Sequence, residues 1–113
     1  MLQTRTPIGL DVTTQLIAAA NNVAFTPVLM NSKVWIPQNT VSSGALNSYL
    51  VYTHISDYAQ AAVTIAAGDK IYWDNTNSVF TNVASGNTLC GYALEPSPSA
   101  SGTGIIEFYS FAA

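Results

Sequence analysis

The chain has 113 residues and a mass of 12.0 kDa, which is enough for one domain with one hydrophobic core. Three residues are Lys or Arg and six are Asp or Glu, so charged residues make up 8% of the chain, against roughly 25% in an average soluble domain. The net charge of −3 argues against a nucleic-acid binder, which needs a basic face, and no apolar run approaches the roughly 18 residues of a membrane-spanning helix.

Residues 1–22 contain few bulky apolar side chains, which predicts an N-terminal arm followed by a β domain over residues 23–113. Asp11 and several threonines interrupt any apolar stretch, so we do not expect a secretory signal here. Within the arm only Gln15–Asn21 favours a helix, and such a helix is too short to be stable alone.

The first half of the β domain contains three strand candidates. Val23–Met30 and Lys33–Gln38 carry Pro27 and Pro37 near their ends, and a proline that cannot donate to a neighbouring strand favours the edge of a sheet. Leu46–Ile55 alternates over ten residues and predicts a longer strand.

The clearest hairpin follows in the second half. In Lys70–Asp74, Ile71 and Trp73 fall on one face and polar side chains on the other, which is the period of a half-buried strand. Residues 74–77 are Asp, Asn and Thr and predict a turn, because such side chains bond to their own backbone. The chain is then expected to resume an extended conformation over Ser78–Asn82.

Two more strands complete the predicted all-β fold. Residues 85–87 form a second turn, and Thr88–Leu94 is a strand with Gly91 inside it. A glycine inside a strand indicates a bulge or a close approach of another backbone. After a proline-containing connection, Thr103–Phe111 is the last strand.

The residues able to carry catalysis are few. The chain has one cysteine, Cys90, and one histidine, His54, and both lie in predicted strands, where a buried thiol and a sheet histidine are the expected roles. The single cysteine also excludes an internal disulfide, so the fold must depend on packing or on oligomerisation. A zinc site needs three or four ligands, more than these two supply.

No other group of residues converges on a reactive site. Asp69 and Asp74 are five residues apart and fall on opposite faces of a strand, and Glu107 lies in a separate segment, so we interpret these carboxylates as turn caps or solvated groups. The turn after Asp74 lacks the glycine and glutamate of a calcium loop, and Ser99–Gly104 lacks the lysine and helix of a phosphate loop and predicts a flexible turn. We therefore expect no enzyme activity, catalytic residue, metal or cofactor.

Two motifs in the second half resemble the capsid cement, or head decoration, proteins of tailed bacteriophages. The first is Ala67-Gly-Asp-Lys-Ile-Tyr-Trp-Asp-Asn-Thr-Asn-Ser-Val, and the second is Ala84-Ser-Gly-Asn-Thr-Leu-Cys-Gly-Tyr-Ala. The resemblance covers residues 66–110 and is faint over 23–65. The motif residues, which we interpret as structural, are Gly68, Asp69, Tyr72, Trp73, Asp74, Gly86, Asn87, Thr88, Leu89 and Gly91.

The resemblance implies a small β-barrel-like or sandwich-like domain of short antiparallel strands that forms a homotrimer. Such a protein is made in the host cytoplasm and then binds the major capsid protein on the outer surface of the virion, where it stabilises the assembled shell. It implies no catalytic residue. The net charge and the lack of a long apolar run lead us to expect no nucleic-acid or membrane partner. The long arm and the Val34-Trp-Ile-Pro segment depart from the family pattern.

The arm is the predicted docking element, because it carries apolar side chains without a local core to hold them. The residues expected to contact the capsid are Leu2, Arg5, Pro7, Ile8 and Leu10. A second hypothesis places exposed Tyr or Trp rings at the trimer interface.

Two alternative functions fit the same composition. One is another virion structural role, such as a head fibre, a spike base or a tail accessory. The other is a carbohydrate-binding module displayed on a capsid, in which Trp35 or Trp73 would stack on a sugar.

Overall fold

The computed structural model describes residues 3–4 and 11–110, and within this part of the chain every regular element is a strand. The strands are β1 (Gln3–Thr4), β2 (Val12–Ile17), β3 (Val28–Met30), β4 (Lys33–Pro37), β5 (Leu46–Ser56), β6 (Lys70–Asp74), β7 (Val79–Thr81), β8 (Thr88–Ala93) and β9 (Ile106–Tyr109). Among these residues there is no helix that could cross a membrane.

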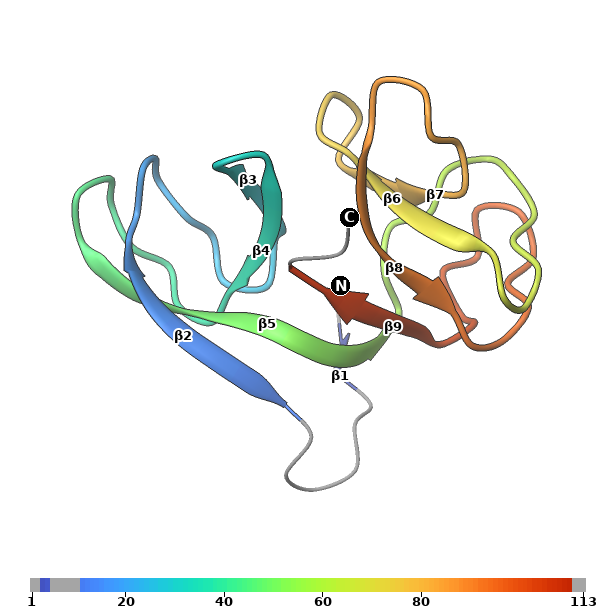
Figure 1. Cartoon of the computed structure of the whole chain (residues 1–113), viewed down its shortest axis with the longest axis horizontal. Coiled ribbons are helices and arrows are strands. Elements are labelled where there is room, and N and C mark those ends of the chain that lie inside the picture. The colour runs from blue at the N-terminus through green and yellow to red at the C-terminus, as the bar shows by residue number, and fades with distance from the viewer. Residues whose placement is uncertain (1–2, 5–10, 111–113) are drawn as a thin grey trace.

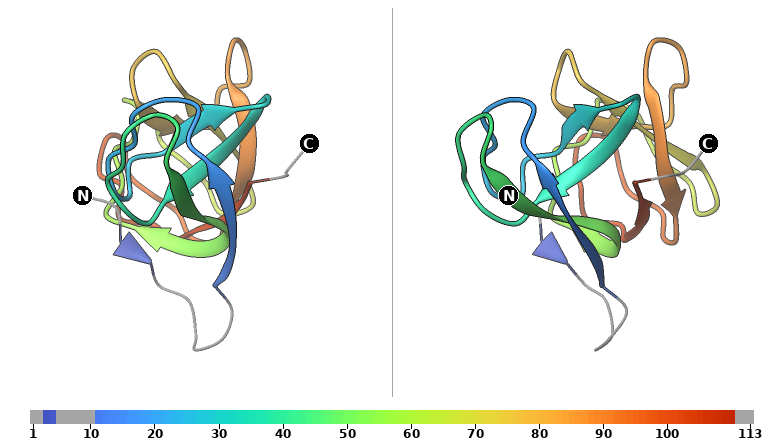
Figure 2. Two further views of the ribbon diagram at one scale, coloured as in Figure 1. Left: turned by 90° about the vertical axis from the view of Figure 1, so that its left-hand side faces the viewer. Right: turned by 60° about the vertical axis from the view of Figure 1, so that its left-hand side comes forward.

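The strands form one antiparallel sheet with the order β3-β4-β5-β9-β8-β6-β7, and β1 and β2 also pair with β5. The sheet curls into a half-barrel, with β3 and β4 on one side and β6 and β7 on the other (Figures 1 and 2). The predicted all-β, barrel-like fold of short antiparallel strands is confirmed.

The hydrophobic core lies inside this curl and is built from alternate residues of the strands. Ile71 and Trp73 of β6 are buried, as their spacing predicted. Ile106 and Phe108 of β9 are buried in the same core cluster. The other members of the core are Val34, Ile36, Leu50, Ile55, Tyr58, Ile65, Phe80, Cys90 and Ala93. Alternation therefore leaves every second residue of β6 and β9 on the outer face. In β5 it holds only for the second half of the strand, because Tyr49 and Leu50 are both buried and the register with β2 shifts after Leu50.

Gly91 meets both expectations raised by a glycine inside a strand. The register between β6 and β8 shifts so that Ile71 pairs with Gly91 and Tyr72 pairs with Leu89, which leaves an extra residue in β8. On its other side Gly91 pairs with Phe108, and a Cβ atom at this position would collide with the backbone carbonyl oxygen of Glu107. The absence of a side chain is therefore what lets β8 and β9 approach.

The expectation of a helix over Gln15–Asn21 is wrong, because residues 12–17 form β2 and pair with the first half of β5. Branched side chains such as Val12 and Ile17 favour a strand, and pairing with a long neighbouring strand outweighs a weak local helix preference. Buried Asn22 also connects the segment after β2 to β5, since its side-chain oxygen accepts hydrogen bonds from Tyr49 Oη (2.6 Å) and Asn47 Nδ2 (3.2 Å).

The loop over Ser99–Gly104 is held by buried polar side chains, in contrast to the expected flexible turn. Gln60 Oε1 accepts hydrogen bonds from Gly102 N (2.9 Å) and Ser97 Oγ (2.6 Å), and Ser97 Oγ in turn accepts one from Gly104 N (3.2 Å). Tyr58 Oη also donates to the carbonyl oxygen of Gly104. The loop takes up residues expected in the last strand, which begins at Ile106 instead of Thr103.

We predict that Gly91→Ala lowers the free energy of unfolding by about 2 kcal/mol or more, because the new methyl group must displace the backbone of β9. Gly86→Ala is the matched control, since Gly86 has a φ of 75° but no atom within 4 Å of an added Cβ. Its expected cost is about 1 kcal/mol, from the backbone conformation alone. Urea unfolding measures both, and a Gly91→Ala variant as stable as Gly86→Ala would contradict the close approach.

Candidate docking surface

Three neighbouring strands carry aromatic and titratable side chains on the outer face of the sheet. We call this set the outer tyrosine cluster; it consists of Tyr52 and His54 on β5, Tyr92 on β8, and Glu107 and Tyr109 on β9. The residues between them on β5 and β9, Thr53 and Phe108, are buried, so strand alternation turns the cluster outward.

The register of the three strands brings the cluster together. Tyr52 lies opposite Tyr109, His54 lies opposite Glu107, and Glu107 lies opposite Tyr92. Side chains that face each other across an antiparallel pair are separated by roughly 5 Å at Cβ, so these five form one continuous patch.

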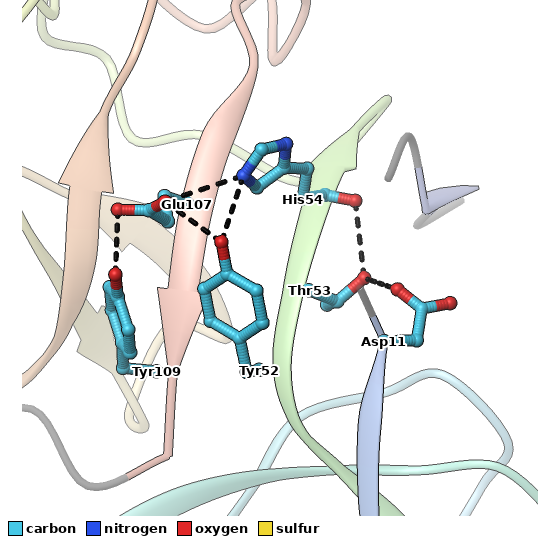
Figure 3. Close-up of polar contacts among 6 residues, drawn as sticks. All are labelled: Asp11, Tyr52, Thr53, His54, Glu107 and Tyr109. Atoms are coloured by element: carbon cyan, nitrogen blue, oxygen red, sulfur yellow. Dashed lines mark hydrogen bonds and ion pairs between the residues drawn. The ribbon is translucent and has the colours of Figure 1, made fainter. Parts of the chain in front are cut away.

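The Glu107 carboxylate lies at the centre of the patch (Figure 3). Oε2 accepts a hydrogen bond from Tyr52 Oη (3.0 Å) and lies 3.4 Å from His54 Nε2, and Oε1 accepts a hydrogen bond from Tyr109 Oη (2.8 Å). The His54 contact is the longest of the three. The two tyrosine hydroxyls therefore fix the orientation of the carboxylate more strongly than the histidine does.

The three tyrosines around this carboxylate are partly exposed to solvent. The ring centroid of Tyr109 is 5.0 Å from that of Tyr52 and 6.5 Å from that of Tyr92. Tyr92 is 38% exposed, and the side chains of His54 and Glu107 are 18% and 24% exposed. Tyrosine is among the side chains enriched at the centres of protein interfaces.

The contacts shift the titration of the central groups. Partial burial alone would raise the pKa of Glu107, but the hydrogen bonds from Tyr109, Tyr52 and His54 outweigh it, so that the pKa is lowered. The hydrogen bond to Glu107, together with burial and the charge of that carboxylate, raises the pKa of Tyr109 to about 12. Glu107 is therefore held ionised and Tyr109 neutral at physiological pH.

The interpretation of Glu107 as an isolated, solvated carboxylate is wrong. Two of its three partners, Tyr52 and His54, lie on β5, more than 50 positions earlier in the chain, and only the pairing of β5 with β9 brings them to Glu107. The available signal was the polar and aromatic alternation of Tyr52 and His54. That pattern does not identify the strand that lies beside it.

The family-motif residues lie in the second half of the sheet, and several of them contribute to its core or its turns. Trp73 is 3% exposed and packs on Phe80 with ring centroids 4.9 Å apart. Asp69 Oδ2 accepts hydrogen bonds from Ala66 N (2.9 Å) and Asn82 Nδ2 (3.0 Å), and these bonds lower the pKa of Asp69.

Asp74 closes the turn between β6 and β7. Its side chain accepts hydrogen bonds from the backbone N–H groups of Thr76 (3.0 Å) and Asn77 (3.1 Å) and from Asn77 Nδ2 (2.8 Å). Most of the remaining motif residues lie at element ends: Gly68 and Gly86 are in turns and have positive φ, and Thr88 and Leu89 begin β8. Asn87 Nδ2 donates a hydrogen bond to the carbonyl oxygen of Val83 (2.9 Å), and Tyr72 lies in the middle of β6.

The predicted docking residues of the arm, Leu2, Arg5, Pro7, Ile8 and Leu10, lie outside the described residues. Of the other candidates, Cys90 is fully buried in the core and His54 lies on the outer face, so the sheet itself separates them. Burial also raises the pKa of the Cys90 thiol. Among the described residues, no three His, Cys, Asp or Glu side chains are grouped closely enough to hold a metal ion.

Trp73 does not provide an exposed platform for a sugar, because its ring is buried against Phe80. A cavity of about 220 Å³ lies beside these two rings and is lined further by Phe25, Thr26, Pro27, Ala59 and Ser78. Trp35 is half-buried, and its indole nitrogen donates a hydrogen bond to the carbonyl oxygen of Met30 (3.0 Å).

The comparison with known families agrees with the two motifs and with the sheet they position. A family model described as "Phage cement protein" matches residues 7–108, nearly the whole chain. The chain belongs to this family. The match extends far beyond the motif region, into the first half of the sheet and part of the predicted arm. Neither a curated protein nor a solved structure matches the chain.

Membership gives this phage cement protein a structural role on a phage capsid. The family is a structural, non-enzymatic one. A protein of this kind acts through the surface that it presents, so the outer tyrosine cluster is the candidate site that the fold provides.

We predict that Glu107→Gln lowers the pKa of Tyr109 from about 12 toward its ordinary value of 10.0, because the negative charge facing the hydroxyl is removed. Resonances of the Tyr109 ring carbon bonded to the hydroxyl, followed by NMR against pH, measure this change. Glu95→Gln removes an equal charge from an exposed loop and should leave Tyr109 unchanged. An equal pKa of Tyr109 in both variants would contradict the contact between Tyr109 and Glu107.

The same contacts predict how stability varies with pH. The folded-state pKa of Tyr109 is raised, so its contribution is complete below about pH 10 and is lost as the pH rises toward about 12. The pKa of Glu107 is lowered, so its contribution is present above 4.5, its ordinary value, and is lost as the pH falls through the folded pKa. Urea midpoints of the wild type should fall at both extremes, and those of Tyr109→Phe should fall less at the alkaline one.

Proposed function

We propose that this phage cement protein binds the major capsid protein on the outer surface of a phage head as a homotrimer and so stabilises the assembled shell. It is made in the host cytoplasm and acts on the virion. Because it binds only the assembled state, it stabilises that state by mass action. Three weak contacts from one trimer act together, since each later contact is effectively intramolecular.

The observation that carries this proposal is the family match over residues 7–108, with the outer tyrosine cluster as the surface that can dock. The cluster presents three tyrosine rings and one ordered carboxylate on an open sheet face. Tyrosine combines a large apolar ring with a polar hydroxyl and loses little conformational entropy on binding, so it suits a protein contact more than a small-molecule reaction.

The trimer is supported by a separate apolar pair at the far end of β2. Ile17 lies opposite Leu46 of β5, and the two are 61% and 57% exposed. Side chains of this size lose contact with water on self-association, at about 25 cal/mol per Å² of apolar area buried. We place the contact between subunits at this pair.

Co-sedimentation with expanded heads tests docking and the role of the arm. We predict that the wild type pellets with heads and that Leu2→Ser, Ile8→Ser and Leu10→Ser together weaken this binding at least about tenfold, because an extended arm contributes apolar contacts to the capsid. These substitutions leave β2 in place, whereas a deletion to residue 14 would remove part of it. Unchanged binding by the folded triple variant would reject the arm, and wild-type protein that stays in the supernatant would reject the capsid role.

Light scattering at micromolar concentration tests the trimer. We expect the mass of three chains for the wild type and of one chain for Ile17→Thr with Leu46→Thr. The matched control is Val83→Thr with Leu94→Thr, which changes two side chains that are 47% and 44% exposed but do not lie on the β2–β5 pair. A monomeric wild type, or equal loss of mass in the control, would contradict the assignment.

Electron microscopy of assembled particles distinguishes the remaining virion roles. Density over the head surface supports cement, whereas density only at a fibre, a spike base or the tail supports the corresponding alternative.

A further inference from the structure

We infer that the outer tyrosine cluster binds an arginine side chain of the capsid protein, with the guanidinium group against Glu107 and alongside the tyrosine rings. This inference rests on the proposed function and adds the chemistry of the partner.

The first argument is the number of acceptor positions on Glu107. An ionised carboxylate has about four acceptor positions, and the described contacts from Tyr52, His54 and Tyr109 use three of them. Two of those contacts fall on Oε2 and one on Oε1. The carboxylate can therefore accept a further donor at Oε1 while both tyrosine hydroxyls stay in place.

The second argument is the weakness of the histidine contacts. His54 Nε2 lies 3.3 Å from Tyr52 Oη and 3.4 Å from Glu107 Oε2, both longer than the usual range of roughly 2.7–3.2 Å. Breaking these two contacts of His54 therefore costs little free energy. A charge-assisted bond from a guanidinium group is shorter and stronger, so it can replace the histidine at Oε2.

The third argument is charge and ring geometry together. The groups that face Glu107 from the neighbouring strands are Tyr52 and His54 on β5 and Tyr92 on β8, and the cationic Lys70 of β6 lies beyond Tyr92 in the same row. Among the ion pairs of the described residues, Glu107 is joined to His54 and not to Lys70. A partly exposed carboxylate bordered by aromatic faces is complementary to a planar cation, and arginine stacks on rings and binds carboxylates with two parallel bonds, which lysine does not.

Binding to expanded heads gives the first test. We expect Glu107→Gln to weaken co-sedimentation at least about tenfold, the loss usual for a hydrogen bond to a charged group. Glu95→Gln, the matched control, removes one carboxylate from an exposed loop and should change binding less than about twofold. The difference in head binding between Glu107→Gln and Glu95→Gln should become smaller as the salt concentration rises from about 50 mM to about 300 mM.

A small probe gives a second test that needs no heads. Nα-acetyl-arginine amide should shift the NMR signals of Tyr52, Tyr92 and Tyr109 saturably in the wild type, and this shift should be absent in Glu107→Gln. Nα-acetyl-citrulline amide has nearly the same shape without the charge and should cause no such shift. Equal shifts with both compounds, or with both proteins, would overturn the inference.

The two tests separate this inference from the proposed function. Wild-type protein that binds heads while Glu107→Gln and Glu95→Gln bind equally well would overturn the arginine site and leave the capsid role intact. Wild-type protein that does not bind heads but shows NMR shifts with the arginine probe would overturn the capsid role and leave the arginine site intact. A glycan panel that shifts the same tyrosines when the arginine probe does not would assign the cluster to a sugar.

Discussion

The pairing of β5 with four other strands is the constraint on which the rest of the fold depends. One edge of this strand carries β2 and then β1, and the other carries β4 and then β9. β5 therefore joins the two sides of the curled sheet in Figure 1. A slip of one residue along it would exchange the core face with the outer face, moving Ile55 out and His54 in. Core packing and the outer tyrosine cluster are thus set by the same register.

The two faces of the sheet are specified by different physics. Inside, apolar side chains exclude water, and Gly91 allows β8 to approach β9. Outside, a few polar contacts order side chains that remain partly exposed, with Glu107 at their centre. Because the chain has few charges, each ordered one contributes a large share of the surface potential. A protein that works by docking gains specificity from such a group at modest cost in solubility.

Much of the fold could be predicted from local pattern. The alternation around Ile71 and Trp73 identified β6 and its inner face, and the glycine inside β8 indicated the close approach at Gly91. β2 could not be predicted in this way, because its stability comes from pairing with residues about 30 to 40 positions away. The same limit applies to the cluster: sequence showed Tyr52 and Glu107 in separate segments, and long-range pairing made them neighbours. The order of the Ser99–Gly104 loop depends likewise on a distant residue, Gln60.

The burial of Cys90 has a consequence for oxidation. Exposed thiols oxidise in aerated solution and can cross-link neighbouring chains. A thiol reacts as its thiolate, and Cys90 is both inaccessible and held protonated by its surroundings. The core therefore keeps this sulfur out of redox chemistry, so that oxidation of Cys90 does not join one chain to another.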